Sequence, residues 1–184
     1  MRCYLFVAVL CLVTPPAYAG ELVVLGGGLK AQPGNERTFT WALDYRHRLA
    51  DHFDLSTAWI NEGHVTNHHR DGAAAQIWAR TPVLDPSFSI SAGAGPYAYF
   101  DTTNVAANAP AIDAHGWGVI YSLALTWRVQ SRLLLQLRAN RIETRRSIDT
   151  TSLLFGVGIE LDDLPPVDGR PAIFTGLAQE AIPN

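Results

Sequence analysis

The chain has 184 residues, of which 48% are hydrophobic, and carries 14 Lys and Arg against 17 Asp and Glu, a formal net charge of −3. This balance argues against a nucleic-acid-binding protein, which carries an excess of positive charge. Both cysteines, Cys3 and Cys11, precede residue 20, so the rest of the chain can form no disulfide.

The N-terminal segment 1–19 is typical of a secretory signal peptide. Arg2 is followed by an apolar run from Tyr4 to Val13, a Pro-Pro break, and the small residues Ala17 and Ala19. This pattern predicts cleavage after Ala19. The apolar run is shorter than the roughly 20 residues with which a helix spans a bilayer. We therefore expect an exported chain whose remaining length suits one domain.

Beyond the signal peptide, apolar and polar residues alternate with a period of two, which predicts strands. In the last such segment, Leu153, Phe155 and Val157 share one face, while Gly156 and Glu160 lie on the other. Each segment is long enough to cross a bilayer as a tilted strand of about 9–11 residues. The eight alternating segments are 21–31, 37–48, 52–62, 71–81, 86–100, 115–128, 131–143 and 149–161.

The connections between these segments alternate in length. Short ones are expected near 49–51, 82–85 and 129–130, and longer ones at 61–70, 101–114 and 141–148. The first connection, at 33–36, belongs with the longer set by parity although it is short itself. Outer-membrane barrels have short periplasmic turns and longer outer loops, so the longer set is expected outside.

Large aromatic residues lie near both ends of the expected strands, as membrane interfaces favour. Near the short turns these are Tyr45, Phe53, Phe88 and Trp127, and near the longer loops Trp59, Phe100 and Trp117. The polar faces carry four acids and four bases, namely Asp44, Asp54, Glu62, Glu160, Arg46, Arg80, Arg128 and Arg138. Because eight strands enclose a space just wide enough for side chains, these charges can pair inside and fill it.

The fold that we predict is therefore a single eight-stranded antiparallel up-and-down transmembrane β-barrel over 20–161, with a polar interior that is plugged. The segment 162–184 is rich in proline, which predicts a linker-like or short disordered tail. The alternative is a soluble barrel with the faces exchanged, apolar inside and charged outside, because periodicity alone does not separate the two.

The stretch NEGHVTNHHRDG, residues 61–72, holds half of the six histidines. Its flanking strands and its Gly63 and Asn67 predict a solvated loop. His64, His68 and His69 form a weak candidate metal site within it, because zinc requires three or four converging ligands and the HExxH pattern is absent.

The outer side is also expected to gather basic residues that could contact lipopolysaccharide phosphates through charge-assisted hydrogen bonds. Nearby acids weaken this candidate rim, which consists of Arg70, His115, Arg141, Arg145 and Arg146.

Several stretches carry resemblances to known families. NEGH, HHRDG, QIWARTPVLD, SAGAGPYAYFDT and HGWG are similar to those of an uncharacterised group of proteobacterial outer-membrane β-barrel proteins, which implies the fold and the location but no activity. The last two segments remotely resemble the end of the lipid A deacylase barrels. That family places His two residues before its catalytic Ser, whereas the corresponding stretch here reads Arg138-Ala139-Asn140 and onward to Glu143 with neither residue. No catalytic residue is carried over.

We therefore expect a small outer-membrane barrel of a Gram-negative bacterium that is not an enzyme and needs no cofactor. Its exterior loops would contact lipopolysaccharide or an external partner, and its other partner would be outer-membrane lipid. The alternatives are a lipid-modifying acyl hydrolase in the same barrel and a soluble periplasmic barrel that binds an apolar ligand. The sequence does not indicate an oligomeric state.

Overall fold

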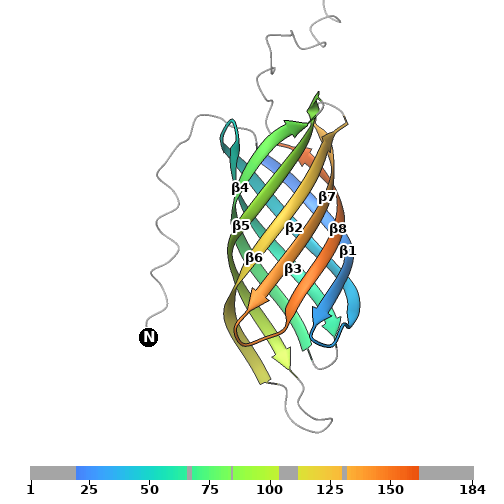
Figure 1. Ribbon diagram of the computed structural model, residues 1–184, viewed down its shortest axis with the longest axis vertical. Helices are drawn as coiled ribbons and strands as arrows, with labels where there is room; N and C mark the ends of the chain where they lie inside the picture. Colours follow the sequence, from blue (N-terminus) through green and yellow to red (C-terminus); the bar gives the residue numbers. More distant parts are fainter. Residues whose placement is uncertain (1–19, 66–67, 84, 104–111, 130–131, 162–184) are drawn as a thin grey trace, which may run out of the picture.

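The computed structural model describes residues 20–65, 68–83, 85–103, 112–129 and 132–161, so the predicted signal peptide and tail lie outside the described residues. The described chain forms eight antiparallel strands (Figure 1): β1 Gly20–Gln32, β2 Arg37–Ala50, β3 Phe53–Val65, β4 His68–Val83, β5 Asp85–Thr103, β6 Ile112–Arg128, β7 Leu133–Thr144 and β8 Asp149–Glu160. Within these residues, no helix is long and apolar enough to span a membrane.

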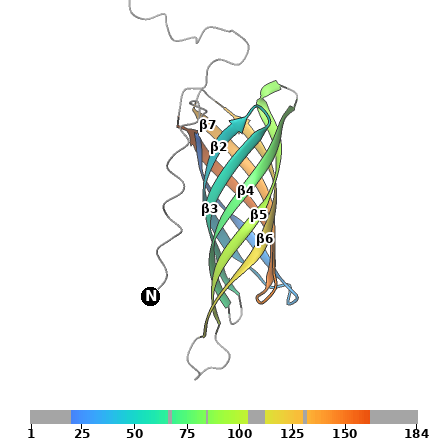
Figure 2. The same cartoon turned by 90° about the vertical axis from the view of Figure 1, so that its left-hand side faces the viewer.

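The strands form one closed barrel in which each strand pairs with its neighbours in the chain. β8 returns to β1, with Leu22 opposite Ile159 and Gln32 opposite Asp149, so the sheet has no open edge. Figure 2 shows the tilted strands running around a single cylinder. The predicted eight-stranded up-and-down barrel is confirmed, and the strand ends differ from the predicted ones by only a few residues.

The barrel has two unlike ends, for which we use fixed names. The turn end holds the connections at 51–52, 84 and 129–132, together with the start of β1 and the end of β8. The loop end holds the connections at 33–36, 66–67, 104–111 and 145–148, and points downward in Figure 1.

The histidine-rich stretch is mostly strand, and its prediction as a loop was wrong. β3 continues to Val65, β4 begins at His68, and His64 lies opposite His69 in the ladder. The register shifts between Asn61 and His64, where Gly63 has a φ of 69° that side chains other than glycine rarely adopt. The prediction ended this strand at residue 62 because the residues that follow are polar. Backbone pairing does not require apolar side chains, so the strand continues through them.

The outward faces of the strands are apolar and the inward faces are polar. Val24 and Phe155 expose 59% and 55% of their surface, whereas Asp44 and Arg138 expose 0% and 2%. The other predicted interior charges are also buried or nearly so: Asp54, Glu62, Glu160, Arg46, Arg80 and Arg128. This arrangement is the reverse of the one that the soluble apolar-ligand alternative requires.

Outward aromatic residues of different strands stack on each other. Phe88 stacks on Trp127 with ring centroids 5.4 Å apart, and Trp59 stacks on Phe100 at 6.2 Å. Trp117 is 70% exposed. The first pair lies toward the turn end and the second toward the loop end, as the two expected aromatic bands require.

Trp78 fills part of the interior, and two guanidinium groups lie close to its ring. The Cζ atoms of Arg46 and Arg138 lie 3.8 and 5.1 Å from its ring centroid. Trp78 Nε1 donates to Ser56 Oγ at 2.8 Å, and Arg138 Nη2 donates to Asp44 Oδ2 at 2.6 Å. Burial of these groups is tolerated because the ring and the carboxylate stabilise the cations.

Toward the turn end, a second set of ion pairs fills the barrel. Arg128 donates to Glu21 and to Glu160, each at 2.5 Å, and Arg80 Nη2 lies 3.0 Å from Asp54 Oδ1. Glu21, which the sequence analysis did not place inside, is 4% exposed. The polar interior is therefore occupied by side chains, as predicted.

The contact between Trp78 and Gly93 yields a test of this packing. A Cβ added at Gly93 would lie 2.4 Å from Trp78 Cδ2, whereas one added at the outward-facing Gly28 would meet nothing within 4 Å. We expect Gly93→Ala to lower the free energy of unfolding by about 1–3 kcal/mol through overpacking. The matched control Gly28→Ala should change it by less than about 1 kcal/mol. Urea unfolding of the barrel in lipid vesicles measures both, and equal effects would contradict the packing.

Candidate functional site

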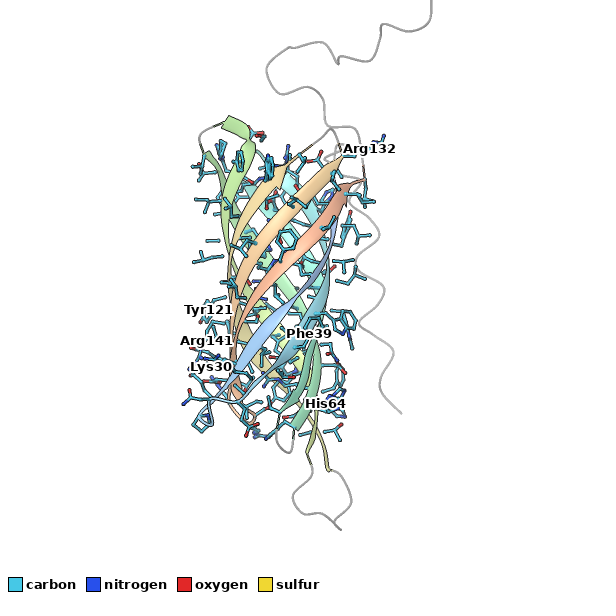
Figure 3. All side chains as sticks on the ribbon, turned by 90° about the vertical axis from the view of Figure 1, so that its right-hand side faces the viewer. Lys30, Phe39, His64, Tyr121, Arg132 and Arg141 are labelled. Atoms are coloured by element: carbon cyan, nitrogen blue, oxygen red, sulfur yellow. The ribbon has the colours of Figure 1, made fainter. Side chains whose placement is uncertain are left out.

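The loop end of the barrel gathers the chemically versatile side chains, and it contains every residue that the sequence analysis proposed for a site. In Figure 3, Lys30, His64 and Arg141 lie toward this end, whereas Arg132 lies at the opposite one. The inner and outer surfaces of the loop end differ in character, because neighbouring residues of a strand point to opposite sides.

Inside the loop end, a single carboxylate joins four strands. Glu62 of β3 accepts hydrogen bonds at Oε2 from Arg70 Nε of β4 and from Tyr97 Oη of β5 at 2.7 Å. Its Oε1 accepts from Arg70 Nη2 at 2.8 Å and from Thr150 Oγ1 of β8 at 2.5 Å. We call these four residues the loop-end cluster. Each carboxylate oxygen accepts two hydrogen bonds, as a buried charge requires.

A second carboxylate, Asp101 of β5, lies beside this cluster. Its Oδ2 accepts from Ser147 Oγ at 2.6 Å and lies 2.8 Å from His68 Nδ1. Arg70 Nη1 donates to Ser147 Oγ at 3.0 Å and to the carbonyl oxygen of Ile148 at 2.5 Å. Arg70 therefore joins the two carboxylates and holds the β7–β8 connection against the barrel mouth.

This arrangement brings a serine, a histidine and an aspartate together, but not in the order that nucleophilic catalysis requires. The hydroxyl of Ser147 donates to Asp101, and His68 contacts the same carboxylate oxygen. A serine nucleophile requires a base that accepts its own proton, with the acid behind that base. Ser147 is instead held as a donor between Arg70 and Asp101.

The three histidines of the candidate metal site do not converge. The rings of His64 and His69 lie against each other with centroids 4.0 Å apart, and His69 Nε2 lies 3.4 Å from Asp71 Oδ2. His68 turns to Asp101 on the inner side. Over the described ranges, no group of three His, Cys, Asp or Glu residues could hold a metal ion. Because neighbouring residues of a strand point to opposite sides, His68 and His69 face opposite surfaces of the barrel wall.

The basic rim is only partly as predicted. Arg70 is 1% exposed and bound to Glu62, so its assignment to the rim was wrong. Arg145 and Arg146 are exposed in the β7–β8 connection. His115 is exposed on β6, with its ring edge-on to Phe100 at 5.1 Å.

Arg141 faces outward on β7, where several groups hold it. Its Nη2 donates to Asp149 Oδ2 at 3.1 Å, its Nη1 donates to Gln32 Oε1 at 2.9 Å, and its Nε lies 3.4 Å from Glu143 Oε1. Its charge is thus largely engaged. The sequence analysis missed Lys30, which faces outward on β1, although the alternation that places Leu29 and Ala31 inside already placed it there.

Removal of the Glu62 charge tests the loop-end cluster. Glu62→Gln would leave Arg70 buried without its counter-charge, and we expect the free energy of unfolding to fall by about 3 kcal/mol or more. The matched control is Glu143→Gln, since Glu143 is 54% exposed and pairs with Arg141; a change within about 1 kcal/mol is expected. Urea unfolding in lipid vesicles measures both. Similar small losses in the two variants would show that the cluster does not stabilise the barrel.

Comparisons with known proteins agree on the architecture. The β-barrel domain of Pseudomonas aeruginosa OprF matches with a TM-score of 0.60 and 10% identity over 76% of this chain and 96% of that one. Yersinia pestis Ail matches with a TM-score of 0.57 and 7% identity over 78% of this chain and 99% of that one. The P. aeruginosa outer membrane protein OprG matches with a TM-score of 0.55 and 11% identity over 78% of this chain and 96% of that one. No family model or curated protein matches the sequence, so the resemblance to lipid A deacylases gains no support. At these identities the likeness shows the fold: a small eight-stranded barrel of the outer-membrane type.

Proposed function

We propose that this protein is a closed, non-enzymatic barrel of the Gram-negative outer membrane whose loop end contacts lipopolysaccharide or an external partner. The observation that carries the proposal is the distribution of side chains between the two faces. Outward residues such as Leu123 and Leu153 are 61% and 58% exposed, while the interior charges are paired with each other. Only a surrounding apolar phase makes such a surface favourable.

The orientation follows from the connections. The turn at 51–52 is short, whereas Thr103 and Ile112 are joined by the longest connection between strands. Outer-membrane barrels carry short turns on the periplasmic side and longer loops outside. The loop end therefore faces the cell exterior in this proposal.

The contact with lipopolysaccharide is supported by exposed cations at the same end. Arg145 and Arg146 are exposed in the β7–β8 connection, where guanidinium groups can donate two parallel hydrogen bonds to a phosphate. The same surface could receive the acidic face of an external protein, which is the other form of the proposal.

The membrane proposal predicts that the protein is recovered with the outer membrane and migrates differently on a denaturing gel before and after boiling. A closed barrel with every strand paired resists detergent until it is heated. Because side chains fill the interior, we also expect no stable conductance steps in planar bilayers. Recovery as a soluble periplasmic protein without a heat-dependent shift would overturn the membrane proposal, and a steady channel would overturn the plugged interior.

One observation favours an acyl hydrolase as the second candidate: Ser147, His68 and Asp101 lie together at the loop end. Because the Ser147 hydroxyl is directed at the carboxylate, we expect unchanged lipid A acylation in cells that express the protein. Mass spectrometry of lipid A, with Ser147→Ala as the matched control, tests this. Loss of an acyl chain with the wild type but not with Ser147→Ala would establish the hydrolase instead.

A further inference from the structure

Four neighbouring strands carry polar residues in one cross-strand row on their outward faces near the loop end. Arg37 of β2 lies opposite Lys30 of β1, Lys30 lies opposite Thr151 of β8, and Thr151 lies opposite Arg141 of β7. Figure 3 shows Lys30 and Arg141 on the same side of the barrel, toward this end. Three of the four residues are basic, which is unusual for the wall of a barrel with an apolar exterior.

The two ends of this row differ in their partners. Arg141 is bonded to Asp149 and Gln32, and Asp149 also accepts from the backbone N–H of Thr144 at 2.9 Å. The side chains of Lys30 and Arg37 have no hydrogen-bond or ion-pair partner among the described residues. Like charges placed directly opposite each other in a sheet repel, so this pair lowers the stability of the free barrel and favours a bound anion.

Directly toward the turn end from this pair, the wall becomes apolar and contains a notch. Gly28 lies opposite Phe39 on one side and Leu153 on the other, and these two side chains are 63% and 58% exposed. A Cβ added at Gly28 would meet nothing within 4 Å, while the ring of Phe39 leans over Gly26, where it would lie 3.3 Å from an added Cβ. The notch between the two raised side chains therefore stays open.

We propose that this wall is a binding site for a phosphorylated lipid of the outer leaflet, in which Lys30 and Arg37 hold a phosphate and the Gly28 notch receives an acyl chain. Charge complementarity selects a phosphate, and the apolar notch next to it selects a molecule that carries a hydrocarbon chain on the same headgroup. In a Gram-negative outer leaflet, the phosphates of lipid A meet both requirements. The site rests on the membrane orientation proposed above and names the part of lipopolysaccharide that is recognised.

The experiment uses the full protein, extracted from outer membranes in a non-ionic detergent, delipidated, and titrated with diphosphoryl lipid A in native mass spectrometry. We expect the wild-type protein to bind one lipid A molecule in this titration. Lys30→Gln combined with Arg37→Gln should raise the apparent Kd about tenfold or more, since two cations are removed from the phosphate. Gly28→Leu, which fills the notch, should raise it about threefold through lost apolar contact.

A second double variant separates this site from the loop cations of the proposed function. Arg145→Gln combined with Arg146→Gln also removes two exposed cations from the loop end, and should raise the Kd clearly less than the Lys30/Arg37 double variant does, since these residues lie outside the row. Arg132→Gln removes one cation at the opposite end of the barrel and should leave the Kd unchanged, in contrast to Lys30→Gln alone. Inorganic phosphate at millimolar concentration should fail to displace the lipid, because it lacks the acyl chain.

An unchanged Kd in the Lys30/Arg37 double variant would overturn the site, and so would an equal loss in the Arg145/Arg146 double variant, which would indicate general attraction to the loop cations. Full displacement by inorganic phosphate would make it an anion site rather than a lipid site. The proposed function fails separately, through the absence of a heat-dependent gel shift in the wild type. The Lys30/Arg37 double variant should still show the heat-dependent gel shift, because it folds normally. A loss of lipid A binding in this variant is therefore distinguishable from a loss of folding.

Discussion

The ladder between β1 and β8 is the interaction on which the remaining structure depends, since it joins the two outermost strands of the sequence and closes the barrel. The backbones of β1 and β8 approach each other closely at glycine residues. A Cβ at Gly27 would lie 2.1 Å from the carbonyl oxygen of Leu153, and one at Gly158 would lie 2.6 Å from that of Leu22. Side chains at these positions would push the strands apart, and an unpaired strand edge in an apolar phase is costly.

Closure separates a narrow interior from the surroundings and thereby decides what the polar faces can do. A charge inside must find its counter-charge inside, which Asp44 does with Arg138 and Glu62 does with Arg70. The outer wall is apolar instead. Near the loop end it departs from this rule, because Lys30 and Arg37 have no ion-pair partner among the residues that the structure describes. The distribution of paired and unpaired charge thus distinguishes residues that hold the barrel from those available to a ligand.

Most of the fold could be predicted from the sequence because strand periodicity is a local property. The alternation of Leu153, Phe155 and Val157 with glycines and a glutamate defines a strand and its two faces without any knowledge of its neighbours. Strand number and chain order followed from the same signal, whereas the direction of the faces followed from the two aromatic bands and the alternating lengths of the connections.

The candidate site was less predictable because it depends on register, which is not local. The partners of Arg70 include Glu62, eight residues away, and Thr150, eighty residues away, and only pairing around the whole barrel brings them together. The bulge at Gly63 was hidden by the polar composition of its surroundings, so strand residues were taken for a loop. Lys30 was overlooked although its face was predictable, because its significance depends on Arg37 across the ladder.

The loop-end cluster has a consequence for the rate at which the barrel opens. Glu62 and Thr150 are 88 residues apart in the chain, so their hydrogen bond forms only after β8 has reached β1. Contacts that arise after the transition state of folding slow unfolding and leave the folding rate nearly unchanged. We therefore expect loss of the cluster to speed unfolding more than it slows folding.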